Sequence, residues 1–168
     1  KDTLALLKTS QDYVSPTRIV EAVVQVNDIR KRAMGRKVIE AMKGDVRGKT
    51  ICILGLTFKP NTDDMRDAPS LSIVQILLDA GAKVRAYDPE GMELASPLMP
   101  DVEMADDLHA AITDSDCVVI VTEWDAFRAL DIDRMARDMR GDTLVDLRNI
   151  YQPERMRKAG LNYVSVGR

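Results

Sequence analysis

Two patterns of apolar and polar residues divide the chain near residue 47. Before it, apolar residues recur at helical spacing, first at Leu4 and Leu7 and then at Ile19, Val20, Val23, Val24 and Val26. After it, short continuous apolar runs alternate with segments of helical spacing, which is typical of βαβ units in a parallel sheet. The pattern predicts a helical region at residues 1–46 and an α/β domain at residues 47–168.

The first region is predicted to contain one long helix over residues 16–42. Ser15 is a suitable N-cap, and Pro16 fits the first helical position. The sheet domain already has its own helices, so we expect the apolar stripe of this helix to link domains or to form a homodimer. A basic cluster beside the stripe is interpreted as a solvated face, because the helix has no aromatic residues for nucleic-acid binding. The cluster comprises Arg30, Lys31, Arg32, Arg36 and Lys37.

The second region is predicted to be a Rossmann-like three-layer α/β domain. Strands are expected at residues 50–54, 83–87, 117–121 and 143–146, with a final edge strand at 163–166. Helices are expected at residues 70–80, 106–113, 131–139 and 153–159, while residues 90–103 are predicted to be loop. The fold class is therefore a parallel sheet preceded by a long helix.

Three of the predicted strands deliver candidate binding residues to one edge of the sheet. Lys59 and Arg66 lie in the loop after the first strand, Trp124 follows the third, and Arg148 follows the fourth. Ligands of such sheets bind beyond the carboxyl ends of the strands. Two or three cations and one aromatic ring favour an anion that carries a flat group, such as a nucleotide. Trp124 either stacks on that group or packs over the sheet rim.

Structural interpretations of the same residues remain open at this point. Arg66 and Arg148 can instead form ion pairs with nearby acids, which are Asp63, Asp64, Asp67 and Asp146. Asp88 follows the second strand, where a dinucleotide-binding fold places its ribose-binding carboxylate, but an Asp-Pro turn explains it equally well. The loop after the first strand lacks both G-x-G-x-x-G and GK[ST]. These residues support nucleotide or phosphorylated-metabolite binding and show no nucleophile, base or metal set.

Composition narrows the class of protein further. The 24 basic and 27 acidic residues nearly balance, so no overall field favours nucleic acid or a membrane surface as a partner. Cys52 and Cys117 lie in apolar runs and are interpreted as buried thiols of a reducing compartment. No transmembrane or signal segment is apparent in the sequence, so we expect a soluble cytoplasmic protein. The chain begins without methionine and looks cut from a longer one.

Four segments in order resemble the carboxyl-terminal half of the UDP-glucose/GDP-mannose dehydrogenase family. They are GLTFKPNTDDMRDAPS at 55–70, YDP at 87–89, VIVTEWDAF at 119–127 and VDLRN at 145–149. The opening KDTLALLK resembles the sequence that directly follows the catalytic cysteine of that family. The resemblance extends over essentially all of the chain.

The resemblance implies an oxidation of the C6 alcohol of a sugar nucleotide to a carboxylate, with two NAD. An amino-terminal domain binds NAD, a long helix forms the dimer, and the carboxyl-terminal domain binds the UDP part. This chain would be the UDP-sugar-binding half, inactive by itself, of an enzyme that converts UDP-glucose to UDP-glucuronate. Neither Cys52 nor Cys117 matches the catalytic cysteine. GDP-mannose or UDP-N-acetylmannosamine as substrate, and a stand-alone nucleotide-binding module, are the alternatives.

The resemblance also implies roles for individual residues. Asp2 matches a catalytic carboxylate that helps activate the hydrolytic water. The residues implied in substrate binding are Phe58, Lys59 and Arg148. Lys1 and Arg66 match positions that contact NAD, which is bound mainly by the other half of the protein. The pattern of strand ends had selected Lys59, Arg66 and Arg148 independently as ligand cations.

Overall fold

Six short strands form one parallel sheet in the computed structural model, which describes residues 2–167. The strands are β1 (Thr50–Leu54), β2 (Lys83–Tyr87), β3 (Glu103–Met104), β4 (Cys117–Ile120), β5 (Thr143–Asp146) and β6 (Asn162–Ser165). Their order across the sheet is β3-β2-β1-β4-β5-β6. This is the strand order of a Rossmann sheet, and its switch point lies between β1 and β4.

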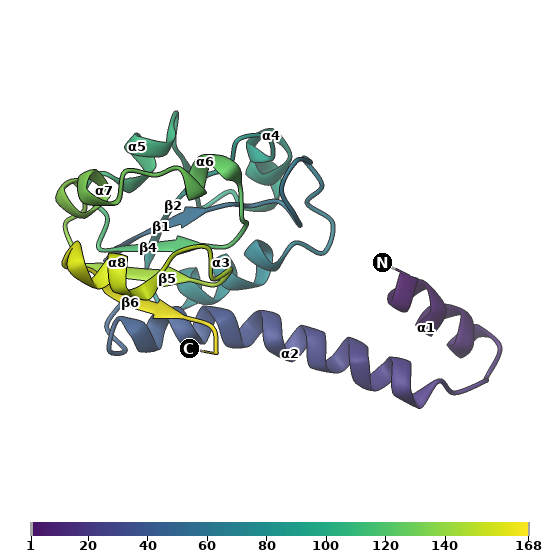
Figure 1. Ribbon diagram of the computed structural model, residues 1–168. Helices are drawn as coiled ribbons and strands as arrows, with labels where there is room; N and C mark the ends of the chain where they lie inside the picture. Colours follow the sequence, from purple (N-terminus) through teal and green to yellow (C-terminus); the bar gives the residue numbers. More distant parts are fainter. Residues whose placement is uncertain (1, 168) are drawn as a thin grey trace.

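Helices cover both faces of the sheet, which confirms the predicted three-layer architecture (Figure 1). One face carries α3 (Pro69–Asp79) and the second half of α2 (Arg18–Ala41). The other carries α5 (Leu108–Ile112), α7 (Ile132–Asp138) and α8 (Pro153–Lys158). Shorter elements border the sheet, namely α4 (Met92–Ala95), the 3-10 helix η1 (Ser96–Leu98) and α6 (Asp125–Arg128). The chain opens with α1 (Asp2–Asp12).

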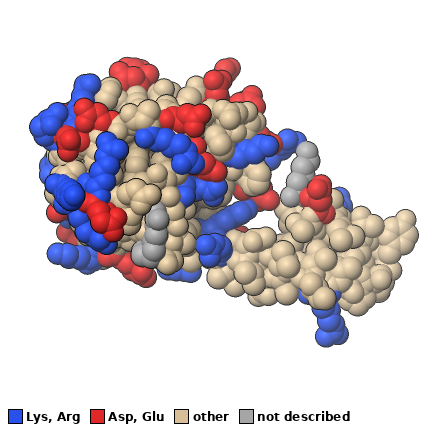
Figure 2. Space-filling view, viewed as in Figure 1, with Lys and Arg blue, Asp and Glu red and all other residues tan. Residues whose placement is uncertain are grey.

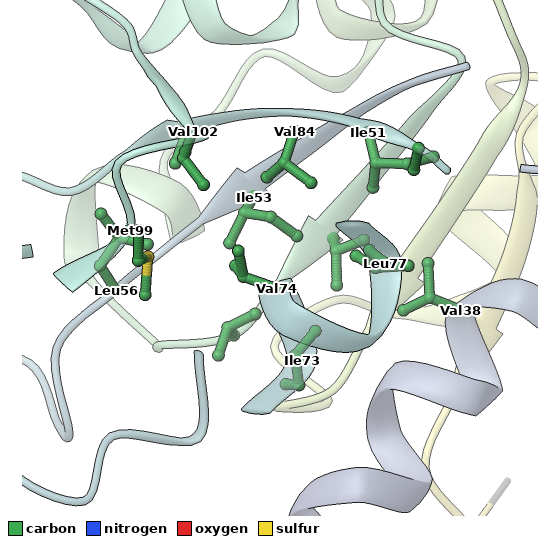
Figure 3. Packing of buried hydrophobic residues seen from close by; sticks show 14 of the residues in the cluster. Val38, Ile51, Ile53, Leu56, Ile73, Val74, Leu77, Val84, Met99 and Val102 are labelled. Atoms are coloured by element: carbon green, nitrogen blue, oxygen red, sulfur yellow. The ribbon is translucent and has the colours of Figure 1, made fainter. Parts of the chain in front are cut away.

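Alternate residues of the central strands supply two hydrophobic cores. Ile51 and Ile53 of β1 point into the core beneath α2 and α3, whereas Cys52 and Leu54 point to the opposite face. Figure 3 shows the first core, where Val38 of α2 lies with side chains of α3 and the sheet. Both faces of β1 are therefore withdrawn from water, which explains its continuous apolar run.

The two halves of α2 have different surroundings. Its second half packs on α3 so closely that a Cβ on Gly35 would lie 3.0 Å from the Ile76 side chain. Its first half projects away from the sheet, with α1 folded back beside it (Figure 1). In this projecting arm Ile19 is 82% exposed and Val26 is 61% exposed. Figure 2 shows charged side chains concentrated on the sheet domain and few on the arm.

The structure differs from the prediction in several elements. Helix α6 lies where no helix was expected. Helix α2 begins at Arg18 rather than at Pro16, because a turn at Tyr13 and Val14 follows α1 and residues 15–17 are not helical; the Thr17 hydroxyl donates to Ser10 Oγ at 3.0 Å. Residues 90–103 are not all loop, since they contain α4, η1 and the start of β3. Pro97 lies near the start of η1, where its missing N–H costs nothing. No helix in the described residues is long and apolar enough to cross a membrane.

Candidate functional site at the carboxyl edge of the sheet

The loops that follow β1 and β4 lie against each other at the carboxyl edge of the sheet. Gly55 ends β1 with a φ of +97°, and a Cβ at this position would lie 2.5 Å from the backbone N of Thr122. Only glycine fits both the conformation and the approach. The Thr122 hydroxyl also donates to the carbonyl of Thr57 at 2.8 Å. The loop that carries Phe58 and Lys59 is thus fixed at its base.

A hollow of about 520 Å³ lies between this edge and α2. Phe58 and Arg148, which follow two different strands, both line it. Phe58 is 54% exposed although it is aromatic, so one of its ring faces is available to a flat group. The remaining walls come from α1, α2, α3 and the strand ends, and include Thr3, Leu4, Asn27, Arg30, Lys31 and Leu147.

Arg148 is held by a carboxylate that the sequence analysis did not consider. Its Nη2 donates to Glu123 Oε1 at 2.7 Å, and its Nε lies 2.5 Å from Oε2. Burial is the largest single effect on Glu123 and opposes its ionisation, but the hydrogen bond and charge of Arg148, a backbone hydrogen bond and the charge of Arg128 together outweigh it, so the pKa of Glu123 is lowered. Asp146, the expected partner, accepts instead from the backbone N–H of Arg148 at 3.0 Å. The guanidinium is oriented by these bonds, and the side chain is still 45% exposed.

Arg66 lies outside this hollow. Its Nε and Nη2 donate to the two carboxylate oxygens of Asp64 at 2.8 and 2.7 Å, which confirms the ion-pair interpretation for this residue. The hydrogen bonds that Arg66 donates to the Asp64 carboxylate raise the pKa of Arg66. The side chain is 73% exposed and borders a second hollow, of about 680 Å³, whose walls include Leu71, Leu94 and Leu98. Arg66 and Arg148 therefore face different surroundings.

Lys59 is exposed directly beside Phe58, although it is not among the residues that line either hollow. Asp2 is exposed at the start of α1, next to Thr3 and Leu4 in the wall of the first hollow. Lys1, the other residue matched to an NAD contact, lies outside the described residues. The structure thus gathers Phe58 and Arg148 in one hollow, while Lys59 and Asp2 are exposed residues that adjoin lining residues in sequence.

One part of the basic cluster on α2 is not simply a solvated face. Lys31 Nζ lies 2.7 Å from Asp67 Oδ1, and its side chain is only 24% exposed. Lys31 and Arg30 also line the first hollow. The sequence placed these residues on a helix but gave no signal that this turn of the helix faces the sheet edge.

The rim residues Asp88 and Trp124 are both buried. Asp88 is 2% exposed and Trp124 is 7% exposed, and the indole Nε1 donates to Asp88 Oδ2 at 3.1 Å. Trp124 therefore packs over the rim rather than presenting its ring to a ligand. Asp88 closes a turn through the N–H groups of Glu90 and Gly91, so the ribose-binding interpretation is wrong.

The residues at this edge of the sheet are better suited to contact a dinucleotide that is bound elsewhere than to form a dinucleotide-binding site themselves. The loop after β1 has no glycine fingerprint, and the carboxylate at the ribose position is occupied by internal hydrogen bonds. Arg66 is 73% exposed, and its Nε and Nη2 are held by Asp64. Cys52 and Cys117 are fully buried, and burial raises the pKa of both thiols, so neither has the properties of a nucleophile.

Comparisons with known proteins identify the family of this domain. Residues 52–153 match the model described as the UDP-glucose/GDP-mannose dehydrogenase family, UDP binding domain. The whole chain is 58% identical to UDP-glucose 6-dehydrogenase of Rhizobium meliloti (strain 1021) and covers 38% of its length. It is 37% identical to UDP-glucose 6-dehydrogenase TuaD of Bacillus subtilis (strain 168), again over all of the chain and 36% of the relative.

Solved structures agree with this result. A UDP-glucose dehydrogenase from Pyrobaculum islandicum superposes with a TM-score of 0.76 at 30% identity, over 97% of this chain and 35% of that one. A GDP-mannose dehydrogenase from Pseudomonas aeruginosa gives 0.71 at 18% identity, over 98% of this chain and 37% of that one, and shows the shared fold. The chain thus spans little more than a third of the relatives it matches. It belongs to the UDP-glucose/GDP-mannose dehydrogenase family and carries that family's UDP-binding domain.

Proposed function

We propose that this chain binds the UDP part of UDP-glucose as the substrate-binding half of an NAD-dependent UDP-glucose 6-dehydrogenase, which oxidises UDP-glucose to UDP-glucuronate. The observation that carries the proposal is the hollow at the carboxyl edge, where Phe58 and Arg148 meet in a domain of the UDP-binding family. The similarity to UDP-glucose 6-dehydrogenases over the whole chain favours this sugar nucleotide over GDP-mannose and UDP-N-acetylmannosamine.

The side chains at the hollow divide the ligand by their chemistry. Glu123 holds the Nε and Nη2 of Arg148, and the N–H groups of Nη1 with the second N–H of Nη2 suit the oxygens of a diphosphate. Lys59 adds a mobile point charge directly beside Phe58. Phe58 offers a ring face to a flat part of the ligand. Together they match an anion that carries a planar group.

The NAD-binding half of the same protein is the proposed partner of this surface. When bound, NAD supplies the hydride acceptor. Arg66 is proposed to contact an anionic part of NAD, because it is exposed and directed away from the hollow that holds Arg148. Asp2 is proposed to hold the proton of the hydrolytic water, since its neighbours Thr3 and Leu4 line that hollow. Lys1 is proposed to touch the nicotinamide end.

A homodimer through α2 is part of the proposal. Ile19, Val23 and Val26 expose a continuous apolar stripe on the projecting arm, and a single helix cannot bury its own stripe. The division at residue 46 into a dimerising region and a UDP-sugar-binding domain remains a proposal too. A cytoplasmic location is supported by Cys52 and Cys117, which are both free thiols.

Calorimetry on the 168-residue chain tests the proposal. UDP and UDP-glucose are expected to bind with similar affinity, because the groups at the hollow address the nucleotide, and GDP is expected to bind at least about tenfold more weakly. The chain alone is expected to reduce no NAD with UDP-glucose, because neither buried cysteine can accept an aldehyde. Absence of UDP binding, or a preference for GDP, would contradict the nucleotide assignment. Turnover by the chain alone would contradict the division between two halves.

A further inference from the structure

Asp88 is bonded to far more of the sheet edge than an Asp-Pro turn requires. Its Oδ1 accepts from the backbone N–H groups of Glu90 at 3.0 Å and Gly91 at 2.8 Å, which is the ordinary pattern of an Asp turn. Its Oδ2 accepts from Leu56 N at 2.7 Å, Thr57 N at 3.2 Å, Thr57 Oγ1 at 3.2 Å and Trp124 Nε1 at 3.1 Å. All six donors are uncharged, and they come from the loops after β1, β2 and β4.

Two of these hydrogen bonds to Asp88 come from Thr57, the residue that directly precedes Phe58. The N–H and hydroxyl of Thr57 contact Asp88, and its carbonyl accepts from the Thr122 hydroxyl at 2.8 Å. A Cβ on Gly91 would lie 2.4 Å from Thr57 Cγ2, so the turn after β2 presses directly against this side chain. The backbone at Thr57 therefore has its position set from two neighbouring loops.

The Oδ2 contacts need an explanation other than the turn. A buried carboxylate is costly unless hydrogen bonds replace its lost hydration. The N–H groups of Glu90 and Gly91 are enough to close the turn. An Asp-Pro turn exposed to water would not need the further donors, which lie more than thirty positions away in sequence. Some of the distant donors belong to the loop that carries Phe58. The remaining donor directly follows Glu123, which is the partner of Arg148. Asp88 thus joins the loop that carries Phe58 to the loop after β4, which carries Glu123, the partner of Arg148.

We propose that Asp88 is a positioning residue for nucleotide binding, which fixes residues 56–59 so that Phe58 faces the hollow and Lys59 is exposed beside Phe58. The inference rests on the proposed function, because Phe58 and Lys59 act as ligand groups only if the hollow takes a nucleotide. Asp88 itself is buried and touches no ligand.

The test compares Asp88→Asn with wild type and with Met135→Ala. In either orientation the Asn amide group points its N–H toward some of the present donors, so contacts are lost without a loss of volume. Met135 of α7 is buried and lines neither hollow, so its truncation lowers stability and serves as the control for hydrogen exchange and UDP affinity, although not for the emission of Trp124, which belongs to the same core. Thr57→Val is a milder second variant that removes the hydroxyl, which contacts both Asp88 Oδ2 and the Lys59 carbonyl, and keeps the backbone N–H contact to Asp88.

Two readouts separate position from binding. Asp88→Asn is expected to raise the hydrogen exchange of residues 56–59 and to shift the emission of Trp124, the only tryptophan, whose indole N–H bonds Asp88. It is also expected to weaken UDP binding about tenfold, as measured by calorimetry. Thr57→Val should change both readouts in the same direction by less. Met135→Ala should lower the Tm and leave the exchange of residues 56–59 and the UDP affinity as in wild type.

The outcomes are distinguishable from failure of the proposed function. If wild type binds no UDP, the proposed function fails. Independently of that result, unchanged hydrogen exchange in Asp88→Asn would show that Asp88 does not position residues 56–59. If wild type binds UDP and a folded Asp88→Asn binds it equally well, the inference is overturned while the proposed function stands. If Asp88→Asn does not fold, Thr57→Val decides, and wild-type exchange and affinity in that variant overturn the inference.

Discussion

Replacing Arg148 by alanine tests whether the two arginines at the carboxyl edge of the sheet, Arg148 and Arg66, serve different ligands. In the structure Arg148 is oriented by Glu123, remains 45% exposed and lines the hollow that also contains Phe58. A hydrogen bond to a charged group contributes about 1.5–3 kcal/mol. Arg148→Ala is therefore expected to weaken UDP-glucose binding by about one to two powers of ten. Lys59→Ala should act in the same direction if its mobile ammonium also reaches the ligand.

Arg66→Ala is the matched control for this variant. It removes the same side-chain type, also paired to a carboxylate and also at the carboxyl edge, but it borders the other hollow. Each variant breaks one ion pair that is open to solvent, so neither should change the Tm much. A difference in ligand affinity between the two then reports on position rather than on charge or stability.

Calorimetric titration of the 168-residue chain with UDP-glucose measures the difference. Arg66→Ala should bind as wild type does, and its effect should emerge only in the NAD dependence of the complete enzyme. If Arg66→Ala weakens UDP-glucose binding as strongly as Arg148→Ala, the two cations do not serve different ligands. The loop after β1 would then be one continuous phosphate clamp.

Two further predictions concern the arm and the acid stability of the edge. Val23→Asp should convert a dimer to a monomer in light scattering. Gln25→Asp should not, because Gln25 is also exposed but lies outside the apolar stripe of α2. A monomeric wild type at high micromolar concentration would contradict the dimer. The folded-state pKa of Glu123 lies below its ordinary value of 4.5, so its contribution to stability is present above that pH and is lost as the pH falls through the lowered value. The stability difference between wild type and Glu123→Gln should shrink in acid unfolding below about pH 4.5, and a difference that does not change with pH would contradict the pair with Arg148.

The sheet could be predicted from sequence because its central strands are buried on both faces. Continuous apolar runs marked β1, β4 and β5 within a residue of their ends. The two-residue strand β3 escaped prediction, since Glu103–Met104 has no period to recognise and pairs with only one neighbour. The turn of α2 that faces the edge escaped for a related reason. Its polar residues Lys31 and Arg30 look solvated until the sheet is placed beside them.

The strand-end cations were predictable from sequence, as was the local pair of Arg66 with Asp64, but the distant partner of Arg148 was not. Lys59, Arg66 and Arg148 follow strand ends, and parallel topology alone brings such residues to one edge. The pairing of Arg148 with Glu123 spans 25 positions. The bonds of Asp88 to the first loop span 31 and 32 positions. Contacts of this length depend on how loops pack after the strands are aligned, and no local pattern records that packing.

Mapping UDP onto the chain by NMR tests the central claim most directly. Backbone amide shifts are followed while UDP is added to the 168-residue chain. The account predicts that the shifts cluster at residues 57–59 and 147–149, around the hollow lined by Phe58 and Arg148, with little change at the opposite, amino-terminal edge near Asp142 and Asn162. Shifts that cluster at the amino-terminal edge, or none at saturating UDP, would contradict the claim that the carboxyl edge is the nucleotide site.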